Sequence, residues 1–222
     1  TETVTVAGNP SPVTAYGVYC GVKASADFVF GTENLSGRSV AIQGLGSVGY
    51  ALAQYLVKEG AQLVVADVNA AALERAKGEF GSQVRIGDVN TIHAESVDIF
   101  APCALGAGLN DTTIPQIVAK IVGGAANNQL AEARHDMALK QRGILYAPDY
   151  AINSGGITSV GYEYFARTGR NPYAYPLAME TMMEHVARIG ETLKSIYTLA
   201  ENKGIGTGEA ANQLAENKFR VT

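Results

Sequence analysis

The sequence predicts an α/β protein with a doubly wound, mostly parallel sheet and a helical C-terminal extension. The apolar, β-branched run 39–43 is typical of a buried strand, and it leads through the glycine pattern at 44–49 into a helical stretch at 50–57. A second buried strand at 61–66 follows at the spacing expected of a strand–helix–strand unit. Strands then alternate with helices as far as residue 146, which indicates a Rossmann-type sheet with right-handed crossovers.

Composition limits the function classes. Of the 222 residues, 47% are hydrophobic and 17% are charged, so the chain can bury a large core. The net charge of -4 argues against a nucleic-acid partner, because phosphate binding needs a basic face. No apolar run approaches the roughly 18 residues of a membrane span. The two cysteines suit a reducing compartment, so we expect a cytoplasmic protein.

The elements follow in a regular order. A helix rich in small residues is expected at 12–30, with a loop at 31–37. After the second strand, the pattern predicts helix 69–80, strand 84–86, strand 97–100, helix 112–118, strand 120–122, helix 131–142 and strand 143–146. Several of these strands are followed by glycine, asparagine, cysteine or proline, and the carboxyl ends of the strands form the ligand-binding edge of such a sheet.

The last third of the chain is expected to be helical, with helices at 153–167, 176–202 and 207–218. The helix 176–202 carries an apolar stripe of leucine, methionine, isoleucine and valine. We expect this stripe to cover another domain or a neighbouring subunit, which would leave apolar surface exposed on this chain.

The glycine pattern predicts a site for a dinucleotide. Gly44 permits a tight turn, Gly46 lets the backbone approach a pyrophosphate, and Gly49 allows the helix to pack closely on the strand. The free N–H groups at the start of the helix and the helix dipole favour the anion.

Asp67 ends the second strand, about 20 residues after the glycines. A carboxylate there accepts hydrogen bonds from a ribose 2′-hydroxyl and repels a 2′-phosphate, which favours NAD over NADP. The alternative is that Asp67 caps the next helix, although Asn69 could do so instead.

Other polar residues admit simpler interpretations. Cys103 is expected to be a buried thiol rather than a nucleophile. The three histidines are not spaced like the ligands of a metal site, so we expect them to be solvated or to cap helices. Asn127, Asn128 and Asn153 lie near the ligand edge, where their amides could hold a nicotinamide or substrate group, or else simply form turns. Ile157 and Val160 share one helix face and could line an apolar pocket or belong to the core.

Five runs of sequence resemble the glutamate/leucine/phenylalanine/valine dehydrogenases, and the leucine dehydrogenase branch most closely. The five runs occur in the same order as in the family, and the resemblance extends over essentially the whole chain. They lie at residues 8–18, 43–49, 98–106, 124–130 and 146–156. The family interconverts an L-amino acid and its 2-oxo acid plus ammonia, using NAD.

The resemblance implies a role for particular residues. The cofactor residues that it implies are Thr14, Gly44, Leu45, Gly46, Ser47, Val48, Gly49, Asp67, Val68, Cys103, Ala104, Asn127 and Asn153. Thr14 corresponds to a threonine that holds the nicotinamide carboxamide, and Asn127 to an asparagine near the reacting amino group. Ile157 and Val160 correspond to walls of the side-chain pocket. Ser47 replaces the usual asparagine and Ser154 a common alanine.

The resemblance also implies an absence. The family's catalytic domain carries a Gly-Gly-Gly-Lys run whose lysine is the general base, a second lysine that binds the carboxylate and an assisting aspartate, and no such run occurs here. We expect residues 1–30 to be a linker and helix leading from that domain, 31–150 the dinucleotide-binding domain and 151–222 the helical extension. The chain begins without methionine, as at a cut edge.

These features together predict the NAD-binding domain of a homo-oligomeric leucine-type dehydrogenase. Alone, the chain is expected to bind NAD without turnover, because it lacks the catalytic lysines. The alternatives are a phenylalanine or tryptophan dehydrogenase domain, a freestanding NAD-binding module, and an oligomerisation scaffold that binds no cofactor.

Overall fold

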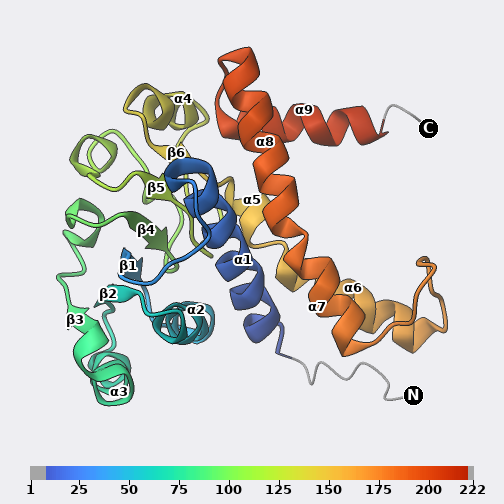
Figure 1. Ribbon diagram of the computed structural model, residues 1–222, viewed down its shortest axis with the longest axis horizontal. Helices are drawn as coiled ribbons and strands as arrows, with labels where there is room; N and C mark the ends of the chain where they lie inside the picture. Colours follow the sequence, from blue (N-terminus) through green and yellow to red (C-terminus); the bar gives the residue numbers. More distant parts are fainter. Residues whose placement is uncertain (1–8, 220–222) are drawn as a thin grey trace.

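A six-stranded, fully parallel sheet organises the protein, with helices on both faces (Figure 1). The computed structural model describes residues 9–219. Residues 1–8 of the predicted linker and 220–222 of the predicted extension lie outside the described residues. The predicted fold class is confirmed.

The strands lie in the order β3-β2-β1-β4-β5-β6. Their bounds are β1 Ser39–Gln43, β2 Gln62–Ala66, β3 Val84–Ile86, β4 Ile99–Pro102, β5 Ile121–Val122 and β6 Leu145–Tyr146. The chain moves outward from β1 to β3, then returns to place β4 on the other side of β1. The reversal between β1 and β4 makes a topological switch point, where open sheets of this type bind ligands beyond the carboxyl ends of their strands.

Alternate side chains of the central strands enter two separate cores. Val40 and Ile42 of β1 belong to the core shared with α1 (Ser11–Phe30), α2 (Ser47–Lys58) and α3 (Ala70–Phe80). Ala41 belongs to the opposite core, which is covered by α4 (Arg134–Gln141) and by the short 3₁₀ helices η2 (Ile92–Ala94) and η3 (Ile114–Gln116). A third such helix, η1 (Gly81–Gln83), precedes β3. A strand buried on both faces is apolar throughout, which is why β1 could be recognised.

The helix predicted at 112–118 is wrong, because only the single 3₁₀ turn η3 forms there. Asn110 closes the preceding turn by accepting hydrogen bonds from the backbone N–H groups of Thr112 and Thr113. Ile117 has already returned to extended backbone, because the chain must enter β5 at Ile121.

The predicted helix 176–202 is two helices, α7 (Met179–Ala187) and α8 (Ile189–Lys203), separated at Arg188. The break lies beside Gly190, whose missing side chain lets α8 approach α1; a Cβ there would lie 3.3 Å from the Cβ of Ala24. Helix breaks commonly coincide with glycine. The remaining helices are α5 (Asp149–Ile152), α6 (Gly155–Thr168) and α9 (Thr207–Phe219).

The apolar stripe does not lie open for another domain, so that expectation is wrong. Met182, Val186, Leu193 and Ile196 are all buried and belong to the same core as α1. Gly17 makes room for them on α1, because a Cβ at this position would lie 2.7 Å from Cδ1 of Ile189. The small residues of α1 thus let α7 and α8 cover it within this chain (Figure 1).

Asp136 of α4 anchors the start of α9. Its Oδ2 accepts hydrogen bonds from the backbone N–H groups of Gly208 (2.9 Å) and Glu209 (3.2 Å), and the hydroxyl of Thr207 donates to Oδ1. The carboxylate is buried, at the positive end of the helix. It therefore acts as an N-cap supplied from a distant helix.

We expect Asp136→Ala to lower the free energy of unfolding by about 1–2 kcal/mol, because the first N–H groups of α9 lose their acceptor. Denaturant unfolding measures the change. Glu74→Ala, which removes an exposed carboxylate on α3, serves as the control and should leave the midpoint unchanged. An Asp136→Ala midpoint equal to that of the wild type would contradict this role.

Among residues 9–219, no helix is both long and apolar enough to span a membrane.

Candidate functional site

A cleft of about 670 Å³ opens near the carboxyl edge of β5 and β6, where they meet the first turns of α1 and α6. It is lined by Pro10, Ser11, Thr14, Val48, Ala125, Asn127, Asn128, Asp149, Tyr150, Asn153, Ser154, Gly156 and Ile157. Six of these residues were singled out from the sequence as candidate site residues: Thr14, Val48, Asn127, Asn128, Asn153 and Ile157. Segments far apart in the chain thus converge where the topology favours a ligand.

The glycine loop lies between β1 and α2. Gly44 has φ +98°, a conformation that strongly favours glycine. A Cβ at Gly49 would lie 2.0 Å from the carbonyl oxygen of Gly44, so the helix can pack on the turn only without a side chain. Gly46 is exposed, and a Cβ there would meet nothing within 4 Å. The loop therefore has a tight interior and an open outer surface.

The start of α2 offers donors to an anion. No side chain caps this helix, and its first turn contains no acidic residue. Ser47 is exposed beside Gly46, and Val48 lines the cleft. Uncapped N–H groups and the positive end of the helix dipole fit a phosphate group at this position.

Asp67 lies against the glycine loop. Its Oδ2 accepts a hydrogen bond from the backbone N–H of Leu45 at 2.5 Å, and its Oδ1 accepts one from that of Asn69 at 2.7 Å. Asn69, rather than Asp67, caps α3, by accepting from the N–H of Ala71. The capping alternative for Asp67 thus does not account for its position, and the carboxylate stands half-buried beside the proposed pyrophosphate loop.

Cys103 and Ala104 form the wall across from the glycine loop. A Cβ at Gly44 would lie 2.8 Å from the Cβ of Ala104, and one at Gly49 would lie 3.2 Å from the Cβ of Cys103. The backbone N–H of Cys103 donates to the carbonyl of Gln43, which holds this loop to the end of β1. Burial raises the pKa of the Cys103 thiol to about 11, consistent with a packing role rather than nucleophilic chemistry.

This raised pKa predicts slow alkylation of Cys103 in the folded protein. With Cys20 replaced by serine, iodoacetamide at pH 8 should react about a hundred times more slowly than with an unfolded thiol, whose pKa is about 8.5. The neutral thiol stabilises the fold below about pH 8.5, and that contribution is lost as the pH rises toward 11. A titration midpoint near 8.5 in the folded state would contradict this environment.

Asn127 and Asn153 meet in the cleft. The amide nitrogen of Asn153 donates to Oδ1 of Asn127 at 2.7 Å and to the carbonyl of Ala125 at 3.2 Å. This pairing leaves the amide nitrogen of Asn127 and the amide oxygen of Asn153 for a ligand. Asn153 follows α5 rather than a strand, so α5 carries it from the end of β6 to the cleft.

Thr14 lies in the first turn of α1, and its hydroxyl donates to the carbonyl of Pro10 at 3.0 Å. The hydroxyl oxygen can still accept a hydrogen bond.

Three apolar residues of the predicted site are exposed. Ile157, which lines the cleft, is 72% exposed and Val160 50%, so the interpretation that they belong to the core is wrong. They lie about one turn apart on α6. Val68, next to Asp67, is 89% exposed. Exposed aliphatic side chains bordering a cleft are suited to contact an apolar ligand group.

Asp149 and Tyr150 are among the cleft residues that the sequence analysis missed. Asp149 is buried, and its carboxylate accepts hydrogen bonds from the backbone N–H groups of Gln129 and Tyr150. The Tyr150 hydroxyl donates to the carbonyl of Gly208 and contacts Asn212 of α9. Both residues begin α5, a few residues after the end of β6, so their position near the carboxyl edge was the signal that could have identified them.

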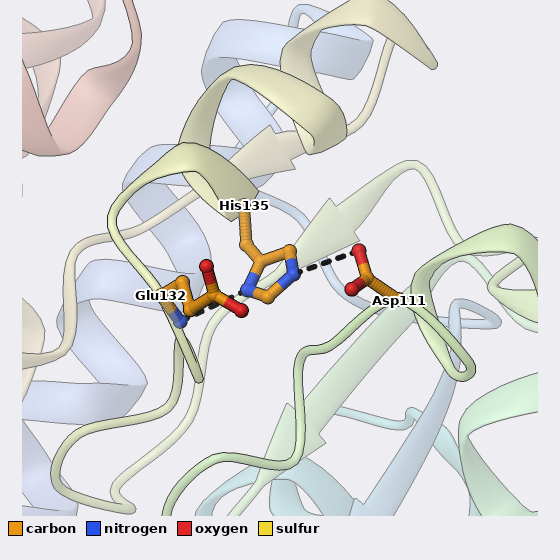
Figure 2. Close-up of side chains that lie close together, drawn as sticks. All are labelled: Asp111, Glu132 and His135. Carbon is orange, nitrogen blue, oxygen red and sulfur yellow. Dashed lines mark hydrogen bonds and ion pairs between the residues drawn. The ribbon is translucent and has the colours of Figure 1, made fainter.

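A second polar cluster lies away from the cleft. Asp111, Glu132 and His135 can bring one ligand atom each within 4.8 Å of one another (Figure 2). Nδ1 of His135 accepts from the backbone N–H of Glu132, and Nε2 lies 3.2 Å from Asp111. Arg134 binds both oxygens of Asp111 and both of Glu132, and it holds the pKa of Asp111 down at about 2.

Because Arg134 already donates hydrogen bonds to all four oxygens of the two carboxylates, a cation would have to displace it. We interpret the cluster as a junction between the loop after β4 and the start of α4. His135 is 1% exposed and His93 8%, so neither is solvated. The capping alternative fits His135, which accepts the backbone N–H of Glu132 just before α4 begins.

Comparison with known proteins identifies the chain's relatives. The family model for Glutamate/Leucine/Phenylalanine/Valine dehydrogenase matches residues 10–220. The chain belongs to this family. The resemblance found in the five sequence runs is therefore confirmed.

Individual members of the family match over nearly the whole chain. It is 46% identical over 212 residues to leucine dehydrogenase of Bacillus cereus, covering 96% of this chain and 55% of that protein. It is 42% identical over 218 residues to phenylalanine dehydrogenase of Bacillus thermotolerans, covering 96% of this chain and 54% of that protein. The crystal structure of L-tryptophan dehydrogenase from Nostoc punctiforme superposes with a TM-score of 0.87 at 40% identity, over 97% of this chain and 62% of that one. The chain thus spans about half the length of the curated relatives it matches.

Proposed function

We propose that this chain is the NAD-binding part of an amino acid dehydrogenase that converts L-leucine, or a related branched-chain amino acid, to its 2-oxo acid and ammonia. The observation that carries the proposal is the uncapped start of α2 beside the open Gly46, with the Asp67 carboxylate held against the same loop. Phosphate and ribose groups have complementary partners there.

The proposal places NAD along one path. The N–H groups at the start of α2 would bind the pyrophosphate, and Asp67 the adenosine ribose, with Val68 next to it. Cys103 and Ala104 would border the passage into the cleft, where Thr14 and Asn153 would orient the nicotinamide. When bound, the nicotinamide ring would accept the hydride that leaves the substrate's α-carbon.

The substrate would enter the same cleft. Asn127 would lie near the reacting amino group, and the aliphatic side chains of Ile157 and Val160 would contact the substrate side chain. The greater identity to leucine dehydrogenase than to phenylalanine dehydrogenase supports a branched-chain substrate. The proposed catalytic lysines belong to a separate catalytic domain, and the active enzyme would be a homo-oligomer in the cytoplasm. We propose residues 31–150 as the cofactor domain and 151–222 as its helical extension.

A phenylalanine or tryptophan substrate is the second candidate, because relatives of both types are about 40% identical to this chain. The two candidates differ in the volume that the pocket must hold.

Titrating this chain into NADH and following nicotinamide fluorescence tests the proposal. We expect saturable binding, and no NAD reduction when leucine, valine, isoleucine or phenylalanine is added at alkaline pH. Absence of NADH binding would refute the proposal and favour a scaffold. In a full-length enzyme carrying this sequence, a higher kcat/KM for phenylalanine than for leucine would refute the branched-chain assignment.

A further inference from the structure

The first turns of α1 and α6 meet beside the cleft, and two adjacent glycines lie at the contact. A Cβ at Gly155 would lie 2.6 Å from the carbonyl oxygen of Val13. A Cβ at Gly156 would lie 2.7 Å from the hydroxyl oxygen of Thr14, and the next atom, also of Thr14, is 3.9 Å away. The two glycines therefore face different kinds of neighbour.

Gly155 faces backbone and Gly156 faces a movable hydroxyl. Gly155 is buried, and its would-be Cβ also lies 3.3 Å from the Cα of Thr14, so a side chain there would push the helices apart. Gly156 is half-buried and lines the cleft. Rotation of the Thr14 side chain would relieve a clash at Gly156, but it would move the hydroxyl from its hydrogen bond with Pro10.

We propose that Gly156 is a positioning residue, which holds the Thr14 hydroxyl at the cleft and keeps the space beside it open for the carboxamide of a nicotinamide. The proposal rests on the proposed function, because it takes the cleft to receive the nicotinamide end of NAD. It assigns to Gly156 a role in ligand selection rather than in folding.

The helix offers a matched comparison. Gly161 lies on α6 five residues further along, and a Cβ there would meet nothing within 4 Å. All three glycines have helical backbone that alanine can adopt, since none has a positive φ. Alanine substitutions at 155, 156 and 161 thus change the same group in one helix and differ in what the new methyl meets.

The experiment measures dissociation constants for NADH and for ADP-ribose, which lacks the nicotinamide, together with the unfolding midpoint. For Gly156→Ala we expect NADH to bind about tenfold more weakly, the equivalent of one lost hydrogen bond, with ADP-ribose within twofold of wild type and an unchanged fold. Gly161→Ala should leave both constants unchanged, whereas Gly155→Ala should lower the unfolding midpoint.

A second variant tests the route through Thr14. In a Thr14→Ala background, which removes the hydroxyl, adding Gly156→Ala should weaken NADH binding by less than twofold. Unchanged NADH binding by Gly156→Ala, or an equal loss of NADH and ADP-ribose, would overturn the positioning role. Wild-type protein that binds neither ligand would instead overturn the proposed function, and the positioning role with it.

Discussion

Gly46→Ala is expected to abolish dinucleotide binding while leaving the fold intact. Gly46 has φ -64° and ψ -172°, which alanine adopts freely, and its would-be Cβ meets nothing within 4 Å. The added methyl would project from the open surface of the loop, where a pyrophosphate must approach the backbone. Losing hydrogen bonds to a charged group, each of about 1.5–3 kcal/mol, should weaken binding at least about 100-fold.

Two further glycines make this result interpretable. Gly49→Ala would place a methyl 2.0 Å from the carbonyl oxygen of Gly44 and should destabilise the protein itself. Gly78→Ala, on α3 with nothing within 4 Å of its would-be Cβ, should leave dinucleotide binding unchanged and raise stability by about 0.5–1 kcal/mol. NADH and ADP-ribose should both be lost in Gly46→Ala, with wild-type thermal unfolding. Wild-type affinity in that variant would mean that the pyrophosphate does not lie on this loop.

The contrast between Gly46 and Gly156 separates two ends of one ligand. Gly46 lies at the start of α2, where both NADH and ADP-ribose would present a pyrophosphate. Gly156 lies in the cleft between α1 and α6, where only a nicotinamide would reach Thr14. If the proposed path is right, Gly46→Ala weakens the binding of both NADH and ADP-ribose, whereas Gly156→Ala weakens the binding of NADH alone.

The central sheet could be predicted because each of its strands has a local signal. β1 and β2 are apolar on both faces, and the glycines that follow β1 require a tight turn whatever the rest of the fold does. The break at Arg188 could not be predicted in the same way. The stripe from Met182 to Leu193 continues across it with helical spacing, so the apolar pattern does not mark the break. The close approach of Gly190 to α1 near the break is a tertiary contact, which the sequence pattern does not show either.

The candidate site was predictable where a residue follows a strand directly, as Asp67 and Cys103 do. It was less predictable where loops bring residues together after several turns. The pairing of Asn127 with Asn153 depends on α5, and the tether from Tyr150 to α9 depends on a helix more than fifty residues later. The burial of the apolar stripe likewise depends on Gly17 and Gly21 of α1. These two glycines lie one helical turn apart, but their spacing alone does not say which segment packs on them.

Asp67 should influence which dinucleotide binds, and its replacement should weaken the preference for NADH over NADPH. The carboxylate holds the N–H of Leu45 and stands beside the glycine loop, so its charge would oppose a 2′-phosphate on the ribose. Asp67→Asn removes the charge but keeps an amide oxygen for Leu45. We expect the ratio of NADPH to NADH affinity to rise at least about tenfold, because a like-charge contact worth about 1.4 kcal/mol or more is removed.

Asn69→Ala provides the control, because it removes the cap of α3 without changing any charge. This variant should lose about 1 kcal/mol of stability and keep the wild-type ratio of the two affinities. An unchanged ratio in Asp67→Asn, together with a stability loss like that of Asn69→Ala, would reduce Asp67 to a residue that only holds the loop. A raised ratio confined to Asp67→Asn, largest at low salt where charges are least screened, would place the ribose at this carboxylate.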